Sequence, residues 1–163
     1  MAKNKEEKTN VMRVLEQKKI AYTAHTYPHE EGVAVDGVTV AKSMGFDPAI
    51  VFKTLVARGA SKQYYVFDVP VAENLDLKKA AKAVGEKSIE MIHQKELLPL
   101  TGYVHGGCSP VGMKKLFPTV FHSSAENLET MIVSAGKIGY QVELAPHDLA
   151  ALVRAKFADI IVE

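Results

Sequence analysis

The sequence predicts a mixed α/β (α+β) fold in a single domain. Short apolar runs rich in β-branched residues alternate along the chain with segments in which apolar residues recur at helical spacing. The chain has 163 residues, of which 47% are hydrophobic and 24% are charged. A domain of this length buries roughly 70% of its unfolded surface, so it needs no second domain to form a core. No Gly-x-Gly-x-x-Gly motif opens a helix, so a dinucleotide-binding fold is not indicated.

The first part of the chain is predicted to contain two helices and two strands. Pro28 ends a strand, Gly45 suits the left-handed position after a helix, and Asp47 followed by Pro48 starts a helical turn. In order, the predicted elements are a helix at 9–19, a strand at 20–27, a polar loop at 29–36, a helix at 38–44, the single turn and a strand at 50–56.

The rest of the chain follows a similar rhythm. An amphipathic helix at 75–84 is capped by Asp76 and ended by Gly85. The other predicted elements are strands at 63–69, 88–92, 119–122, 131–134, 139–144 and 159–162, a helical turn at 94–98, a glycine-rich loop at 101–110 and a helix at 147–156.

Lys53 lies at the centre of the apolar strand predicted at 50–56. Because side chains alternate along a strand, Lys53 shares one face with Val51 and Leu55. The other face holds Phe52, Thr54 and Val56. An ammonium group between two apolar neighbours must reach solvent, meet an anion or lose its proton. The pattern therefore marks Lys53 as a candidate functional residue.

Charge and composition restrict the partners and the location. The formal net charge of +1 gives no support for DNA binding, although a local basic face could still hold a polyanion. Cys108 is the only cysteine, so no intrachain disulfide can form, and a reducing cytoplasm is the expected location. The N-terminal residues lack the apolar core of a signal peptide, and no run of about 18 apolar residues occurs. We therefore expect no membrane partner.

Histidine and cysteine offer two weak candidate sites. His25 and His29 have a spacing that would place both on one face of a metal-binding helix, but Pro28 breaks such a helix. Cys108 could act as a nucleophile with His105 nearby in sequence, yet a lone loop cysteine is more often a small packing residue. We therefore expect no metal and no cofactor.

Two loops could contact a ligand. Residues 101–112 contain four glycines, whose backbone N–H groups could approach a carbonyl or a phosphate, although a plain cluster of turns is an equal alternative. Residues 133–139 offer a hydroxyl and a cation, or a simple hairpin connection. Lysines that could meet phosphates, each of which alone is an ordinary surface residue, are Lys78, Lys79, Lys82, Lys114, Lys115 and Lys137.

Short blocks occur from about Lys8 onward in a distinctive order. They are VFKTLV at 51–56, PV at 70–71, LDLKKAAK at 75–82, TGY at 101–103, GGCSP at 106–110, GMKK at 112–115, SAGK at 134–137 and ADI at 158–160. In this order they resemble the YbaK-type Cys-tRNA(Pro) deacylases, of the superfamily of prolyl-tRNA editing domains. The resemblance implies one editing domain at 9–163, after a flexible tail at 1–8, with a mixed, strongly curved sheet flanked by helices.

The resemblance also implies a function and a site. The protein would remove cysteine from mischarged tRNA(Pro), and could act on Cys-tRNA(Cys), with prolyl-tRNA synthetase as a partner. Lys53 matches the family's essential lysine and is expected to stay protonated and hold the tRNA 3′ end. The amides of Gly106 and Gly107 would face the developing oxyanion, where one donor typically contributes about 3 kcal/mol. Positions expected to contact the substrate are Tyr27, Thr54, Ser109 and Ser134, and those expected to contact tRNA are Lys78, Lys79, Lys114, Lys115 and Lys137.

In that family the cysteinyl thiol of the substrate attacks its own carbonyl, forming a cyclic thiolactone and releasing tRNA. The enzyme then supplies position and electrostatics, and Cys108 would be dispensable. A hydrophobic pocket distinguishes one methylene by only about 1 to 3 kcal/mol. A synthetase that accepts proline therefore cannot easily refuse cysteine by size, and a separate editing site is needed. Open alternatives are an Ala-tRNA(Pro) deacylase, Lys53 as a general base or Schiff base, and a noncatalytic tRNA- or synthetase-binding module with Lys53 guarding a strand edge.

Overall fold

The computed structural model describes residues 8–163, so the predicted tail lies outside the described part except for Lys8. The helices are α1 (Asn10–Gln17), α2 (Gly37–Met44), α3 (Leu77–Val84), α4 (Gln94–Thr101) and α5 (Pro146–Val153), with 3-10 turns at Pro48–Ile50 and Ser123–Asn127. The strands are β1 (Thr23–Thr26), β2 (Phe52–Gly59), β3 (Tyr64–Pro70), β4 (Ile89–Met91), β5 (Thr119–His122), β6 (Met131–Ser134), β7 (Tyr140–Leu144) and β8 (Lys156–Ala158). The mixed α/β class is confirmed.

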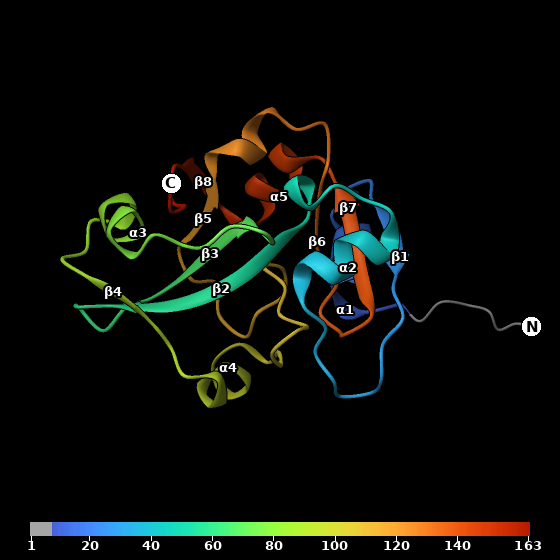
Figure 1. Ribbon diagram of the computed structural model, residues 1–163, viewed down its shortest axis with the longest axis horizontal. Helices are drawn as coiled ribbons and strands as arrows, with labels where there is room; N and C mark the ends of the chain where they lie inside the picture. The colour runs from blue at the N-terminus through green and yellow to red at the C-terminus, as the bar shows by residue number, and fades with distance from the viewer. Residues whose placement is uncertain (1–7) are drawn as a thin grey trace, which may run out of the picture.

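The strands divide between two sheets, whereas the sequence suggested one. The smaller sheet is antiparallel, in the order β1-β7-β6. The larger sheet has the order β4-β2-β3-β5-β8, with antiparallel pairs on the β4 side and parallel pairs from β3 to β8. In Figure 1 the long β2–β3 hairpin runs away from the smaller sheet, with α2 beside the smaller sheet and α3 and β4 toward the opposite end of the molecule. No helix within residues 8–163 is long and apolar enough to cross a membrane.

Helix boundaries follow from capping chemistry. Asp36 accepts a hydrogen bond from the Thr39 N–H at the start of α2, and Asp76 accepts from two N–H groups at the start of α3. Gly45 and Gly85 adopt the left-handed conformation after these helices, as predicted.

The C-terminal elements differ from prediction. The helix expected at 147–156 ends at Val153, because Arg154 takes a left-handed conformation with φ of 59°. The last strand is therefore Lys156–Ala158, and beyond it Ile161 makes only an isolated bridge with Leu75. Periodicity could not reveal this early stop, because arginine is an uncommon residue at such a position.

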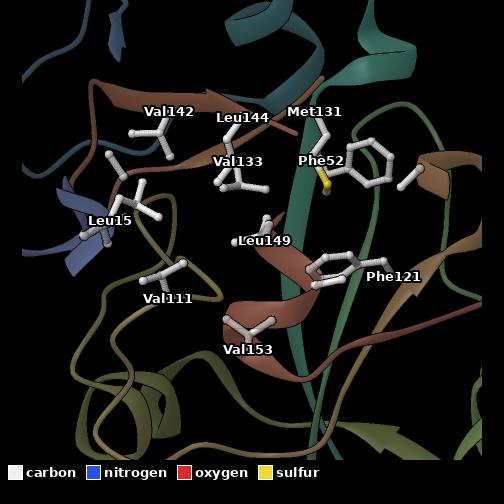
Figure 2. Close-up of a cluster of buried hydrophobic side chains, with 14 of the residues drawn as sticks. Leu15, Phe52, Val111, Phe121, Met131, Val133, Val142, Leu144, Leu149 and Val153 are labelled. Atoms are coloured by element: carbon white, nitrogen blue, oxygen red, sulfur yellow. The ribbon is translucent and has the colours of Figure 1, made fainter. Parts of the chain in front are cut away.

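The main core lies between the two sheets and is closed by α1 and α5. Figure 2 shows Leu149 of α5 surrounded by apolar side chains from the other elements. The buried side chains of this main core include Leu15, Phe52, Val111, Phe121, Met131, Val133, Val142, Leu144, Leu149 and Val153. This packing fixes the beginning of β2 against the smaller sheet, which is where the candidate site lies.

The two faces of β2 are covered by different elements, as alternation predicts. Leu55 and Ala57 pack in the cluster that contains the α3 residue Ala80. Phe52 joins the main core, and Val56 packs beside Cys108. The predicted strand is thus present, shifted by a few residues toward the C-terminus.

Asp68 is a buried carboxyl group on β3, directly opposite Thr54 of β2. Thr54 Oγ1 donates to Asp68 Oδ1 at 2.5 Å, whereas Asp68 Oδ2 has no hydrogen-bond partner in the described part of the chain. Burial raises the pKa of Asp68 to about 7, against the opposing effect of the Thr54 hydrogen bond. The fold therefore favours the protonated form of this group.

The pH dependence of stability tests this burial. The unfolded Asp68 has a pKa of about 3.9, so between that value and the folded value the native chain binds the extra proton. The contribution of Asp68 to the free energy of unfolding is therefore fully present below about pH 4 and is lost as pH rises toward about 7. For the wild type, we expect the free energy of unfolding, measured by urea denaturation, to lose about 4 kcal/mol of the Asp68 contribution across this range. In Asp68→Asn this loss should be absent. Parallel pH profiles for the two proteins would contradict the assignment.

Candidate functional site

A cavity of about 340 Å³ lies beside the beginning of β2. Its walls come from the N-terminal end of α2, the glycine-rich loop and the smaller sheet. The polar and glycine residues that line it include Tyr27, Asp36, Lys53, Thr54, His105, Gly106, Cys108, Ser134 and Gln141. Segments far apart in the sequence therefore meet at one concave site.

An open edge of β2 explains why the cavity forms here. One edge of β2 pairs with β3 along almost its whole length. On the other edge, β4 pairs only with Ala57–Gly59, and Val51 bridges to Ile132 of β6. Between these contacts, residues 53–55 have no strand partner on this edge within the described chain. Side chains from both faces of β2 can therefore reach the same cavity, as Lys53 and Thr54 do.

Lys53 is a partly buried cation in the cavity wall. Desolvation lowers its pKa, while the negative charges of Asp36 and Glu73 act in the opposite direction. Among residues 8–163, no carboxylate comes within 4.0 Å of the Lys53 ammonium. An anionic ligand in the cavity would therefore stabilise the charged form of this side chain.

The two adjacent glycines occupy different environments. Gly106 lines the cavity with φ of 90°, and a Cβ there would lie 2.7 Å from the Cβ of Ala34. The Gly107 N–H donates to the carbonyl of Val104 at 3.0 Å and is not free to stabilise an oxyanion. In this structure Gly107 closes a turn, so of the two predicted donors Gly106 is the one that the fold places at the cavity.

Three of the four predicted substrate contacts line the cavity. They are Tyr27, Thr54 and Ser134. Burial raises the pKa of Tyr27, so its hydroxyl stays protonated. Ser134 Oγ accepts from the Gly136 N–H at 3.1 Å, which leaves its own proton available. Ser109 is the exception: it is fully buried outside the cavity lining, and its hydroxyl accepts from the Val111 N–H. The structure therefore places Ser109 away from the cavity, unlike the other three residues.

The predicted tRNA-binding lysines are scattered and differ in their contacts. Lys78 and Lys79 begin α3, at the opposite end of the molecule from α2 in Figure 1. Lys79 Nζ lies 3.1 Å from Asp159 and 3.2 Å from Glu163, an arrangement that ties α3 to the C-terminal segment. Lys114 Nζ donates to the Pro99 carbonyl, Lys115 lies over Phe117 and Lys137 lies over Tyr140. Lys137 is near the cavity in the chain's fold, because the backbone of its loop packs on Gly107, the neighbour of the cavity residue Gly106.

Cys108 faces the cavity but is poorly suited to act as a nucleophile. Its side chain is buried, and burial, followed by the negative charge of Asp68, raises the pKa of the thiol to about 12. The two histidines that suggested a metal site have separate partners: His25 Nε2 lies 2.8 Å from Glu143, and His29 Nδ1 lies 3.1 Å from the Tyr27 carbonyl. In the described part of the chain, no three metal-ligating side chains gather.

Sequence reasoning missed three cavity residues. The sequence predicts a loop at Asp36, although the position of this residue before an apolar helix marks it as a cap. His105 was considered only beside Cys108. Gln141 is 6% exposed, and its Oε1 atom has no hydrogen-bond partner among residues 8–163. Because the same strand also carries Glu143, a glutamine here is not distinctive in the sequence.

A family model and a relative of known sequence both connect this chain with aminoacyl-tRNA editing. The model of the aminoacyl-tRNA editing domain family matches residues 32–152. A protein of Enterococcus faecalis named "Putative Cys-tRNA(Pro)/Cys-tRNA(Cys) deacylase EbsC" is 45% identical over 161 residues, covering 98% of each chain.

Two solved structures share the fold. One, described as a putative trans-editing enzyme for prolyl tRNA synthetase, superimposes with a TM-score of 0.79 at 24% identity, covering 94% of this chain and 95% of that one. The other, the hypothetical protein APE2540, has a TM-score of 0.82 at 18% identity and covers 93% and 99%. By the family match and the identity to its relative, the chain belongs to the aminoacyl-tRNA editing domain family.

Proposed function

We propose that this protein is a trans-editing aminoacyl-tRNA deacylase that removes cysteine from Cys-tRNA(Pro) and also acts on Cys-tRNA(Cys). The observation that carries the proposal is Lys53, a partly desolvated ammonium in the wall of a ligand-sized cavity, with no carboxylate of residues 8–163 within 4.0 Å. The aminoacylated 3′ end of tRNA places phosphates beside a carbonyl ester, so it supplies the missing anion. The name of the Enterococcus faecalis relative, which shares 45% identity, supports the same substrate.

The cavity residues divide the work of binding. Lys53 holds the tRNA 3′ end through phosphate or ribose oxygens and so orients the ester. Gly106 brings the backbone of the glycine-rich loop to the cavity wall, because the absence of a Cβ lets it pack closely against Ala34. Thr54 and Ser134 contribute hydroxyl groups from β2 and β6.

The reaction needs no protein nucleophile. The thiol of the bound cysteine attacks its own ester carbonyl, a sulfur–carbon bond forms, and the bond to the ribose oxygen breaks. The thiol proton ends on that ribose oxygen, and the products are a cyclic thiolactone and free tRNA. The protein contributes by holding the thiol near the carbonyl and by excluding other geometries. The high pKa of Cys108 agrees with this division of roles.

Prolyl-tRNA synthetase is the proposed partner. A net charge of +1 gives little sequence-independent attraction to tRNA, so recognition of tRNA(Pro) would be shared with the synthetase. The structural neighbour described for prolyl tRNA synthetase supports this choice. Incubating the protein with Cys-, Ala- and Pro-charged tRNA(Pro) tests the function and the acyl preference together: loss of the cysteinyl ester alone is expected, and no loss of any ester would refute the proposal.

Neutralising Lys53 tests its role. We expect Lys53→Met to lower kcat/KM for Cys-tRNA(Pro) by about ten- to a hundredfold, the usual loss for a hydrogen bond to a charged group. Thermal stability should not fall, because the substitution removes a desolvated charge. Lys156→Met is a matched control, since Lys156 is an exposed strand lysine on β8. Full activity of Lys53→Met would exclude this role.

Arginine at position 53 separates positioning from proton transfer. Lys53→Arg keeps the charge but cannot act as a base at neutral pH. We expect Lys53→Arg to retain a higher kcat/KM for Cys-tRNA(Pro) than Lys53→Met. If both variants were equally inactive, the general-base or Schiff-base roles of Lys53 would be favoured instead, and borohydride trapping would distinguish these two.

Removing the Cys108 thiol tests the absence of a protein nucleophile. We expect Cys108→Ala to keep kcat/KM within about a factor of three of wild type, because a buried, protonated thiol supplies no nucleophile. Deacylation of Cys-tRNA(Pro) by the purified variant is the measurement. A collapse of activity in a variant with unchanged melting temperature would restore Cys108 as a catalytic candidate.

A further inference from the structure

We propose that the main-chain N–H group of Thr54, on the open edge of β2, donates a hydrogen bond to the carbonyl oxygen of the bound aminoacyl ester. The proposal rests on the deacylase function proposed above and adds to it a donor that stabilises the developing oxyanion. It follows from the direction of the backbone groups along β2 and from the place where β2 and β6 part.

The ladder between β2 and β3 fixes the direction of each backbone group of β2. In an antiparallel ladder, the N–H and C=O groups of alternate residues point to the partner strand, and those of the residues between them point away. The Val71 N–H donates to the Val51 carbonyl at 2.8 Å. In the same register, the Gly59 N–H donates to the Gln63 carbonyl at 2.8 Å. Odd-numbered residues of β2 therefore face β3, and Thr54 directs its N–H and C=O groups to the other edge.

β6 is arranged in the same way on the facing wall. The Ala135 N–H donates to a carbonyl of β7 at 3.0 Å, so Ser134 directs its backbone groups away from β7 and toward β2. Val51 and Ile132 form a parallel bridge between β2 and β6, but no further residue pair extends it within residues 8–163. The two strand edges therefore meet once and then part. The cavity lies where they part, since Thr54 and Ser134 both line it.

The edge of β2, and not only one of its faces, is turned toward the cavity. The Phe52 side chain packs in the main core, and Lys53 lies on the opposite face of the strand. Both residues nevertheless line the cavity, together with Thr54 and Leu55. Because side chains alternate, consecutive residues of a strand share one cavity only where the strand edge faces it. Thr54 is partly exposed, so a ligand that fills the cavity meets its backbone.

The ester carbonyl is the ligand group that suits this N–H donor. When the substrate thiol adds to the ester carbon, negative charge collects on the carbonyl oxygen, and it leaves that oxygen when the bond to the ribose breaks. A fixed backbone N–H group that faces such an oxygen stabilises the charge as it develops. Lys53 directly precedes Thr54, so its ammonium can meet the phosphate or ribose while the next N–H group meets the adjoining ester.

Replacing the Thr54 N–H group by an oxygen atom tests the proposal. The α-hydroxy analogue of threonine, introduced at position 54 by cell-free translation, keeps the side chain that bonds to Asp68 and removes the donor. We expect kcat for Cys-tRNA(Pro) to fall about a hundredfold or more with little change in KM, the loss typical of one oxyanion donor.

The matched control is the same replacement at Thr26, an exposed residue of β1. The Tyr27 N–H donates to the Gly139 carbonyl at 3.0 Å, so the Thr26 N–H points to the outer edge of β1, away from β7. Each replacement also weakens one ladder bond, because it turns the preceding carbonyl into an ester. The two proteins should therefore lose similar amounts of thermal stability, and the Thr26 replacement should keep kcat close to wild type.

Hydrogen exchange of the Thr54 amide is a second measurement, which needs no altered protein. In the free protein, Thr54 should exchange faster than Lys53 and Leu55, whose N–H groups face β3. The ligand is an uncleavable analogue in which cysteine is joined by an amide to the ribose of a 5′-phosphorylated adenosine. At saturation, it should slow the exchange of Thr54 and leave that of its two neighbours unchanged.

Each outcome supports or overturns the proposal. An unchanged kcat after replacement at Thr54, or equal losses of kcat at Thr54 and Thr26, would refute it. If the replaced proteins do not fold, hydrogen exchange decides: slower exchange of Thr54 with the analogue supports the proposal, and constant exchange refutes it. If wild type cleaves no cysteinyl ester, the proposed function itself fails. If wild type cleaves the ester and the Thr54 replacement keeps kcat, only the role of Thr54 fails.

Discussion

The site depends on one electrostatic constraint, a lysine ammonium that β2 holds in a partly desolvated place. Alternation along β2 puts Lys53 on the same face as the apolar Leu55, which packs in the cluster that contains α3. Desolvation there disfavours the charge, and no carboxylate of the described chain lies within ion-pair distance to offset it. An incoming anion therefore stabilises the charged form of this lysine more than it would stabilise a solvated surface lysine. This difference separates Lys53 from the lysines of α3, which are solvated or already paired.

The fold turns that constraint into a binding site by leaving part of a strand edge open. β2 pairs with β4 only near its end and touches β6 only through Val51, so the segment between these contacts faces the cavity. The main core anchors the start of β2 through Phe52, as Figure 2 shows. The smaller sheet then completes the opposite wall with Ser134 and Gln141. Paired strands on both walls suit a mechanism that relies on positioning.

Much of this arrangement could be predicted from the sequence, and the failures have physical causes. Alternation identified the faces of β2, and capping residues such as Asp76 and Gly85 marked helix ends correctly. Sequence could not show that the Gly107 N–H is used within a turn or that Ser109 is buried away from the cavity, because loop hydrogen bonds depend on tertiary geometry. The early end of α5 at Arg154 was hidden for a related reason, since the left-handed conformation there has no residue signature. Gln141 needed the sheet pairing before its unpaired oxygen became visible.

The pKa of Lys53, followed by NMR of its side-chain nitrogen with and without a ligand, tests the central claim most directly. A suitable ligand is an uncleavable analogue in which cysteine is joined by an amide to the ribose of a 5′-phosphorylated adenosine. In the free protein the pKa should lie below the ordinary lysine value because of desolvation, and binding should raise it, because the phosphate stabilises the ammonium. A pKa that stays constant or falls when the analogue binds would show that Lys53 does not meet an anion in this cavity.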